Sequence, residues 1–325
     1  MARTASKPPA SDGVTPVEAG RFAADLGRLW PEGGRLGLAV SGGPDSLTLL
    51  LLAHAAIPGS FSVATVNHGL RAEATEECAL VEQVCGKRGI SCTVLTIAIG
   101  AGNVQAAARE ARYAALAAWA EREGLSALAT AHHADDQAET LVMRLNRASG
   151  LAGLAGVRPR GIVPKARLPL LRPLLGWRHA ELATILRRSG LEPALDPSNA
   201  DEAYDRVRVR GALATADWLD VKAVATSAAH LAEADEALDW MVEREWAENV
   251  AVIDDGLGYE PAAPRAVVLR VVTRIVEGFG GDPRGGAIAR LVEELESGGG
   301  GNVAGVSARI EDGGWVFRPE TPRRS

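Results

Sequence analysis

The residues with the clearest chemical potential lie in the run LGLAVSGGPDS, residues 36–46, where an apolar stretch breaks into glycines and polar residues before a helical run. Gly42 and Gly43 let the backbone approach an oxyanion without a Cβ in the way, and Ser41 and Ser46 add hydroxyl donors. The helix that follows directs free N–H groups and its positive dipole end at the same point. This order of strand, glycine loop and helix start predicts a phosphate-binding loop, and hence a nucleotide.

Two common nucleotide-binding motifs do not describe this loop. It has no Lys-Ser/Thr ending, so it is not a Walker A loop, and it lacks the GxGxxG spacing of a dinucleotide site. From the loop alone one alternative stays open, an ordinary glycine-rich turn in which Asp45 caps the helix.

A second group of polar residues lies in TAHHADDQAET, residues 130–140, which begins with the pair His132 and His133. Asp136 and Glu139 are three apart on a predicted helix and can share a face. Carboxylates in this arrangement suit Mg²⁺, which prefers oxygen ligands and usually bridges to phosphates. A zinc site is disfavoured because no thiol accompanies the histidines. A plain helix cap would explain one acid but not the cluster.

The elements that must position these groups alternate along the first 200 residues. Strand signals cover residues 35–40, 61–67, 92–99 and 127–131, and helical runs cover 47–56, 74–88 and 104–123. This alternation predicts an α/β fold, a doubly wound parallel sheet with helices on both faces. Ligands of such a sheet bind beyond the carboxyl ends of the strands. The loops at 41–46, 68–71 and 132–136 all follow predicted strands.

Beyond residue 150 the pattern loosens into loops rich in glycine and proline, followed by a predicted helix at 178–189 and a long amphipathic helix at 223–249. Two helices and a short terminal strand pair follow, at 264–277, 286–296, 303–310 and 315–318. We therefore predict four parts: a disordered tail (1–16), a catalytic domain (17–217), a connector helix (218–250) and a small, mainly helical C-terminal domain (251–325).

The bulk composition fits a globular protein of about two domains, with 325 residues, 47% hydrophobic and 23% charged. No apolar run reaches the roughly 18 residues that a membrane span needs, and the polar N-terminus lacks a secretory core. These features predict a cytoplasmic protein. The three cysteines, Cys78, Cys85 and Cys92, form no CxxC pair, which argues against a cysteine-ligated cluster and favours reduced thiols.

Charge is unevenly distributed along the chain. The net charge is −6, yet residues 144–210 hold thirteen Lys/Arg against six Asp/Glu, while residues 220–325 hold nineteen acids against eleven bases. A phosphate backbone responds to local potential rather than to the total charge, so the first segment is a candidate nucleic-acid surface. An ordinary solvated surface stays open as the alternative.

Several motifs resemble one family. SGGPDS resembles the SGGxDS loop of the PP-loop ATP pyrophosphatases, which cleave ATP to AMP and pyrophosphate, and residues 132–140 resemble the HxxDDxxET motif of its tRNA-modifying branch. Further similarities are VNHGLR (66–71), NVQAAAREARY (103–113), RASGLAGLAG (147–156) followed by RPLL (172–175), and DPSNADEAYDRVRVR (196–210). Two positions depart from the family pattern, Asn67 for an acid and Val207 for an asparagine. On these motifs the chain is identified as a member of the tRNA(Ile)-lysidine synthase family, in its short form.

The resemblance implies an activity and its partners. ATP adenylates the 2-oxo group of the wobble cytidine in the CAU anticodon of tRNA(Ile), and the amine of free L-lysine then displaces AMP to form lysidine. The cofactors implied are ATP and Mg²⁺, and a homodimer through the C-terminal helices is implied by the family alone. An adjacent carboxylate can accept the proton that the lysine amine must lose.

The resemblance also implies roles for individual residues. The ATP-binding set is Ser41, Gly42, Gly43, Asp45, Ser46, His68, Arg71, His132 and His133. The catalytic set is Asp45, Arg112 and Asp136, of which Asp45 and Asp136 hold the metal. The set for tRNA or lysine is Arg109, Glu139, Arg206, Arg208 and Arg210. Arg109 and Arg112 are three apart on a helix and can reach one anionic ligand together.

Three other functions are weighed against this one. A tRNA thiolase of the same superfamily commonly carries CxxC pairs, which this chain lacks. An amidotransferase-type synthetase for a small molecule would leave the basic segment unexplained. A nucleotide-sensing module that binds ATP without cleaving it is disfavoured by the acidic cluster.

Overall fold

The computed structural model describes residues 12–67, 69, 73–97, 104–194, 205–284 and 286–320. The chain divides into two compact units, one up to Leu231 and one from Ala232, and each is described by itself. The boundary falls within the long helix α9 (Val221–Asn249). The predicted division into catalytic domain, connector and C-terminal domain remains a proposal.

The first unit is built on a six-stranded sheet in the order β3-β2-β1-β4-β6-β5. Its strands are β1 (Leu36–Ala39), β2 (Phe61–Asn67), β3 (Cys92–Thr96), β4 (Ala127–Ala129), β5 (Arg160–Ile162) and β6 (Pro169–Leu171). All neighbours are parallel except β5, which runs antiparallel to β6 at the edge. In the centre of the sheet Leu38 is in register with Val63 on one side and Ala129 on the other.

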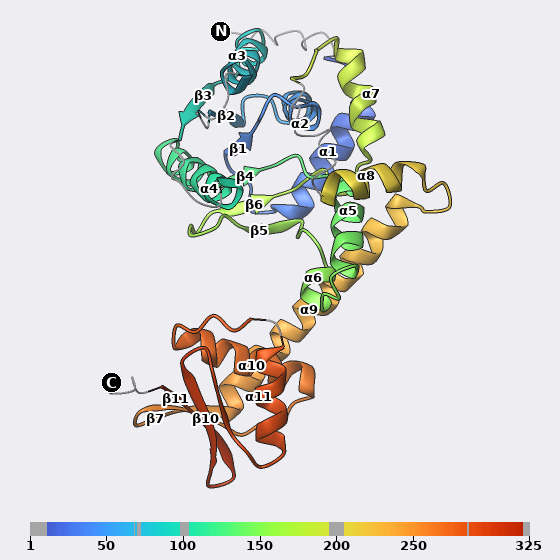
Figure 1. Ribbon diagram of the computed structural model, residues 1–325. Helices are drawn as coiled ribbons and strands as arrows, with labels where there is room; N and C mark the ends of the chain where they lie inside the picture. The colour runs from blue at the N-terminus through green and yellow to red at the C-terminus, as the bar shows by residue number, and fades with distance from the viewer. Residues whose placement is uncertain are drawn as a thin grey trace. The chain divides into compact units, whose positions relative to one another are not determined.

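Helices cover both faces of this sheet, with α1, α2 and α7 on one side and α4 on the other (Figure 1). The helices of the unit before α9 are α1 (Pro16–Leu29), α2 (Pro44–Ala56), α3 (Glu73–Gly86), α4 (Val104–Arg122), α5 (Ala134–Leu145), α6 (Leu151–Leu154), α7 (His179–Ser189) and α8 (Asp205–Thr215). Side chains of a parallel strand alternate between the two faces, so each face needs its own core. The predicted α/β class is confirmed.

The two cores explain the composition of the central elements. Helix α2 is buried from Ser46 to Ala53, because it lies between the sheet and the flanking helices α1 and α7. On the opposite face Trp119 of α4 packs over Gly37, where an added Cβ would lie 2.8 Å from the indole ring. A side chain at position 37 would therefore push α4 away from the sheet.

Three features differ from the sequence predictions. Helix α2 begins at Pro44, earlier than the predicted start at residue 47, because proline is well suited to the first helical turn. Strands β5 and β6 occupy a region predicted to be loop, and strands of three residues leave little pattern to detect. Within the segment 1–16 that is predicted to be a tail, Val14 is buried and Thr15 caps α1, while residues 1–11 lie outside the described residues.

The second unit contains a five-stranded sheet in the order β7-β8-β11-β10-β9, with antiparallel neighbours. Its strands are β7 (Val250–Ile253), β8 (Gly256–Tyr259), β9 (Gly301–Val303), β10 (Val306–Glu311) and β11 (Gly314–Pro319), and its further helices are α10 (Arg265–Gly278) and α11 (Ala287–Glu296). The predicted helices and terminal strand pair are present, but the prediction of a mainly helical domain left out strands β7, β8 and β9 of the sheet. The additional strands β7, β8 and β9 are short, and β8 and β9 also contain glycine, which weakens their alternation.

None of the helices in the described part of the chain is both long and apolar enough to cross a membrane.

Candidate active site

The glycine loop lies where β1 ends and α2 begins. Gly42 has φ +86°, a left-handed conformation that glycine adopts without strain, and a Cβ there would lie 3.2 Å from the carbonyl oxygen of Glu77. Gly43 is the N-cap of α2 and offers no side chain to the first helical turn. The backbone N–H groups of that turn therefore remain available to an anion.

The two loop serines differ in what they do. The buried Ser46 hydroxyl accepts the N–H of Ser41 at 3.1 Å and donates to the carbonyl of Gly43 at 3.0 Å. The Ser41 hydroxyl lies 3.3 Å from that of Ser46 and belongs to an exposed residue. Ser46 thus braces the loop from inside, while Ser41 is the hydroxyl with access to a ligand.

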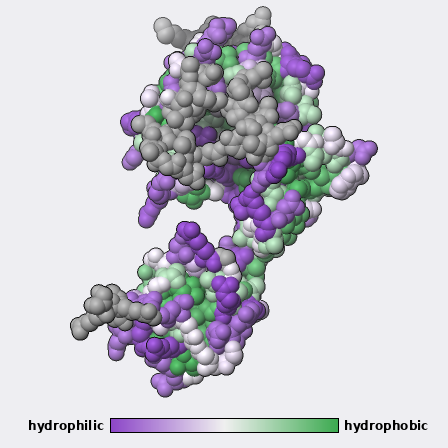
Figure 2. Space-filling view, in the orientation of Figure 1, coloured by the Kyte–Doolittle hydropathy of each residue, from purple (hydrophilic) through white to green (hydrophobic). Residues whose placement is uncertain are grey.

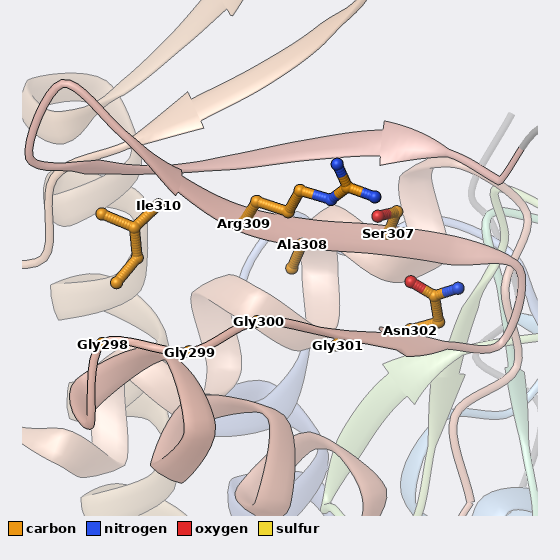
Figure 3. A pocket seen from close by; sticks show the side chains of 9 residues that line it. All are labelled: Gly298, Gly299, Gly300, Gly301, Asn302, Ser307, Ala308, Arg309 and Ile310. Carbon is orange, nitrogen blue, oxygen red and sulfur yellow. The ribbon is translucent and has the colours of Figure 1, made fainter.

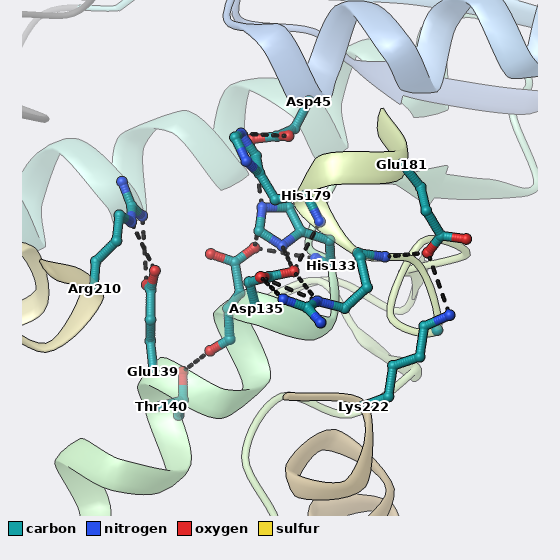
Figure 4. A network of polar contacts seen from close by, with 12 residues as sticks. Asp45, His133, Asp135, Glu139, Thr140, His179, Glu181, Arg210 and Lys222 are labelled. Atoms are coloured by element: carbon teal, nitrogen blue, oxygen red, sulfur yellow. Dashed lines mark hydrogen bonds and ion pairs between the residues drawn. The ribbon is translucent and has the colours of Figure 1, made fainter. Parts of the chain in front are cut away.

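His133 joins the loop to the second polar group. Its Nε2 lies 3.5 Å from Oδ2 of Asp45 and 3.6 Å from Oδ2 of Asp136 (Figure 4). The carboxylate of Asp136 also accepts the backbone N–H of His133 at 3.0 Å, which fixes the start of α5. The two acids predicted to hold the metal are therefore brought to the same nitrogen from α2 and α5.

The electrostatics of His133 reflect these carboxylates. Burial lowers the pKa of the imidazole, but Asp45, Asp136 and Asp135 outweigh burial and raise the pKa above its ordinary value. A cation is thus favoured at this position between the acids. Oδ1 of Asp45 is buried and has no hydrogen-bond partner, so the cluster retains an acceptor for a further positive or donor group.

His132 has the opposite character. Burial, together with Arg172, Arg206 and Arg109, outweighs the attraction of Asp136 and lowers the pKa of His132 to about 4. Its Nδ1 lies 2.9 Å from the hydroxyl of Thr130. His132 is therefore a neutral imidazole at pH 7, suited to hydrogen bonding rather than to balancing charge.

Glu139 is buried one turn along α5 and is paired with α8. Its carboxylate accepts Nε of Arg206 at 2.8 Å and Nε of Arg210 at 2.7 Å, and Arg206 also reaches Asp136 at 3.3 Å. Arg208, predicted alongside these two arginines, instead pairs with Asp205 on its own helix. Of the three α8 arginines predicted for tRNA or lysine, two are thus already engaged by acids of the site.

The basic segment at 144–210 is partly neutralised by acids from other parts of the chain. Beyond the pairs of α8, ion pairs join Arg160 to Glu32, Lys165 to Glu110, and Arg188 to Glu18. Hydrophilic side chains gather on the first unit along α5 and α8 (Figure 2). The local excess of positive charge that the sequence indicates is therefore smaller at the folded surface.

Helix α4 presents Arg109 and Arg112 around Tyr113. The two guanidinium carbons lie 5.0 Å and 5.7 Å from the centre of the tyrosine ring, and Nη2 of Arg109 lies 3.5 Å from the tyrosine hydroxyl. Both arginines are exposed, and no ion pair of either is found among the described residues. The structure keeps them together, as their spacing predicts.

Two predicted ATP-binding residues, His68 and Arg71, lie outside the described residues. The neighbouring Asn67 is described, and its side-chain oxygen accepts the N–H of Gly69 at 2.9 Å while its amide donates to Thr75 at 3.3 Å. An aspartate could accept the N–H of Gly69 and also the hydroxyl proton of Thr75, because a threonine hydroxyl can donate as well as accept. The departure at this position thus keeps both the turn and the contact with Thr75.

Sequence reasoning missed His179, the first residue of α7. Its Nε2 lies 3.7 Å from Oδ1 of Asp45, and its ring centre lies 5.5 Å from that of His133 (Figure 4). Asp135 holds this end of α7 by accepting the backbone N–H of His179 at 2.7 Å. The residue follows no motif and lies far from Asp45 in sequence, so only the folded chain reveals it.

A concave region lies in the other unit, between the glycine run 298–301 and β10 (Figure 3). Arg309 is its only ionisable side chain, and Asn302 and Ser307 are its other polar groups. It contains no acid and no histidine, so it cannot perform the acid, base or metal chemistry that the first unit can. We assign the active site to the first unit.

Comparison with known proteins places this arrangement in a class. Residues 19–216 match the PP-loop domain family ATP_bind_3. Among solved structures the chain is similar to the U34-tRNA thiolase NcsA from Methanococcus maripaludis, with a TM-score of 0.54 and 18% identity over 66% of this chain and 76% of that one. That likeness concerns the fold alone. The first unit is a PP-loop domain.

Curated relatives narrow the class. The chain is 50% identical to the tRNA(Ile)-lysidine synthase of Novosphingobium aromaticivorans, over 94% of this chain and 95% of that protein. It is 40% identical to the protein of the same name from Zymomonas mobilis, over 90% of this chain and 91% of that one. The chain belongs to the tRNA(Ile)-lysidine synthase family, as its ordered motifs predicted.

Proposed function

We propose that this protein is an ATP-dependent ligase that attaches lysine to the 2-position of the wobble cytidine in the CAU anticodon of tRNA(Ile). Membership of the lysidine synthase family supports this directly. The observation that carries it in the structure is the convergence of Asp45 and Asp136 on His133, next to a glycine loop whose helix N-terminus is uncapped. Such a site can receive the phosphates of ATP beside two carboxylates.

The loop has a defined part in this reaction. Gly42 and Gly43 keep the backbone open to phosphate oxygens, and the first N–H groups of α2 face the charge that grows on the departing pyrophosphate. The Ser41 hydroxyl adds one donor. Arg112 and Arg109, held together on α4, are proposed to neutralise anionic oxygens of ATP or of the tRNA backbone.

Magnesium fits the acids of the site. Mg²⁺ prefers oxygen ligands, and Oδ1 of Asp45 is buried without a hydrogen-bond partner, so it can accept a coordinating cation. Asp45 and Asp136 would hold the ion, which would screen the phosphate charges when bound. His133, with its raised pKa, balances the two carboxylates in the same place.

The second half of the reaction needs a place for the lysine amine. Glu139 and Asp136 lie on one face of α5, and their present partners, Arg206 and Arg210, are half-exposed cations. An ammonium group can take a position that a guanidinium now holds, because both are donors to the same carboxylates. We propose that this pair of acids receives lysine and that one of them accepts its proton.

The rival thiolase activity is disfavoured by the position of the cysteines. All three lie on α3 and β3, and Cys85 is fully buried. Contact with Cys92, together with burial, raises the pKa of the Cys85 thiol, which makes it a poor nucleophile. Among the described residues no group of three or more acids, histidines and cysteines is arranged to hold a metal ion with protein ligands alone.

One assay tests the proposal. Pyrophosphate release and incorporation of labelled lysine are measured with ATP and CAU-anticodon tRNA(Ile), with and without lysine, and with a tRNA of another anticodon as control. We expect lysine incorporation only with the CAU tRNA. Incorporation of lysine into both tRNAs, or into neither, would contradict the proposal. The cytoplasmic location and the homodimer remain predictions, the second of which light scattering tests.

A further inference from the structure

Asp45 has an imidazole on each of its two oxygens. His133 faces Oδ2 at 3.5 Å and His179 faces Oδ1 at 3.7 Å, and the two rings approach the carboxylate from α5 and α7 (Figure 4). The ring centres are 5.5 Å apart and the rings are tilted by 43°. The carboxylate is thus bracketed, and rotation about its terminal bond would bring an oxygen out of reach of one ring.

The position of His179 is fixed by contacts that do not involve its own ring. Asp135 accepts the N–H of His179 at 2.7 Å and two N–H groups of Arg178 at 3.1–3.2 Å. The N–H of Ala134 donates to the carbonyl of Trp177 at 2.8 Å. These bonds hold the start of α7 against the start of α5. The backbone of His179 is therefore fixed at a position from which its ring lies beside Asp45.

The distance between His179 and Asp45 is that of a near contact. At 3.7 Å the pair is an ion-pair contact but is too long for a hydrogen bond, and Oδ1 of Asp45 has no other donor although it is buried. A buried carboxylate oxygen in this state is costly unless a partner closes on it. A shift of the half-exposed imidazole by less than 1 Å would complete the bond.

We propose that His179 is a positioning residue that orients the carboxylate of Asp45 toward the magnesium–ATP complex. The inference rests on the proposed use of ATP and adds a residue that none of the motifs contains. His179 acts through Asp45: by closing on Oδ1, opposite His133 at Oδ2, it restricts rotation of the carboxylate, and each oxygen keeps a lone pair for the cation. Pre-orientation of a ligand in this way favours binding, because less freedom is lost when the cation arrives.

The test compares nucleotide affinity with and without the metal, using the full-length protein and a non-hydrolysable ATP analogue in a calorimeter. We expect His179→Ala to weaken binding of the analogue about 10-fold in Mg²⁺, the effect of losing about one hydrogen bond to a charged group. In EDTA the affinity should equal that of the wild type. His179→Gln, whose amide nitrogen can take the place of Nε2, should recover most of the loss.

His54 offers a matched control on the same helix as Asp45. Its Nε2 lies 4.0 Å from Oδ2 of Asp12, so it is also a histidine that faces an aspartate, but it lies in the last turn of α2. His54→Ala should leave the affinity for Mg²⁺ and analogue unchanged. Equal affinity of the wild type and His179→Ala in Mg²⁺ would overturn the inference, and so would an equal loss with and without the metal.

Failure of the inference can be told apart from failure of the proposed function. If the wild-type protein binds the analogue but forms no lysidine, the proposed function is contradicted. The binding data for His179→Ala then still decide whether His179 positions Asp45. If the wild-type protein forms lysidine and His179→Ala binds the analogue in Mg²⁺ as tightly as the wild type, the proposed function stands and His179 has no role in the site.

Discussion

Glu139 in the first unit and Glu245 in the second are buried to a similar degree, with 2% and 7% of each residue exposed, but they are satisfied by different partners. Glu139 is paired with the guanidinium groups of Arg206 and Arg210, whose side chains are half-exposed. Among the described residues, the donors to Glu245 are all neutral: the Tyr259 hydroxyl, two backbone N–H groups and a side-chain amide.

The carboxylate of Glu139 can therefore exchange its ion-pair partners for another cation, whereas the carboxylate of Glu245 cannot exchange its hydrogen-bond donors. Arginine side chains on the surface can swing into water and yield to another cation at modest cost. The backbone donors to Glu245, from Ala262 and Ala263, are fixed by the fold and have no second position. A buried acid with mobile cationic partners is suited to binding, whereas one with fixed neutral donors is suited to holding a loop in place.

The largest effect is expected at the centre of the exchangeable site. Asp136→Ala removes the carboxylate that faces His133 and caps its backbone N–H. We expect pyrophosphate release to fall by at least about 100-fold, because a preorganised charge beside the phosphates is lost. Affinity for tRNA, measured by filter binding, should be nearly unchanged. Wild-type turnover by the purified variant would contradict the assigned role.

Glu139→Gln tests whether the carboxylate of Glu139 binds lysine in place of its arginine partners. We expect lysine incorporation to fall by about 10-fold or more, with a raised KM for lysine, since a charge-assisted bond to an ammonium becomes a neutral one. The stability should fall by only about 1 kcal/mol, because the two arginines left behind are half-exposed and stay hydrated. Saturation curves for lysine and urea unfolding measure the two effects. An unchanged KM for lysine would remove Glu139 from the proposed pocket.

Glu245→Gln tests the opposite arrangement. We expect the free energy of unfolding of the second unit to fall by about 2 kcal/mol, because an amide replaces a charged acceptor of several donors. Lysidine formation per folded molecule should be unchanged. Glu248→Gln is the matched control, since Glu248 is exposed and pairs only with Arg244, one turn back on α9, among the described residues. Equal stability of the two variants would show that Glu245 is not the anchor of its loop.

The same residue predicts a pH dependence. Burial raises the pKa of Glu245, but the hydrogen bonds from Ala262, Tyr259, Ala263 and Asn249 outweigh it and hold the pKa below its ordinary value. Its contribution to stability is therefore complete above the pKa of the unfolded chain, about 4.3, and is lost as the pH falls through the lower pKa of the folded state. Unfolding curves between pH 7 and pH 3 should converge for the wild type and Glu245→Gln at the acid end.

The smallest effect is expected for tRNA binding. Neutralising Arg206, Arg208 and Arg210 together should weaken binding and flatten its salt dependence by about one unit of slope rather than three. Two of these charges already face Glu139, and the third faces Asp205, so each offers a phosphate only part of its charge. Arg274→Gln in the second unit is the control. An unchanged salt slope would place the tRNA contacts elsewhere.

Much of the site could be predicted from local sequence because its chemistry is local. Ser41 to Ser46 and His132 to Asp136 each follow a strand directly, and parallel strands present their carboxyl ends at one edge of the sheet. The family assignment from ordered motifs is confirmed by the relatives. The strands β5 and β6 were not predicted, since three residues carry too little alternation to be recognised.

The sequence by itself determined the glycine loop, the pairing of strand and helix around it, and the family, because each depends on residues that are neighbours along the chain. Only the tertiary structure decided that His179 reaches Asp45, that Arg206 and Arg210 pair with Glu139, and that acids elsewhere reduce the basic segment. Contacts between side chains far apart in sequence depend on how helices pack across the sheet, and no spacing in the sequence encodes that distance.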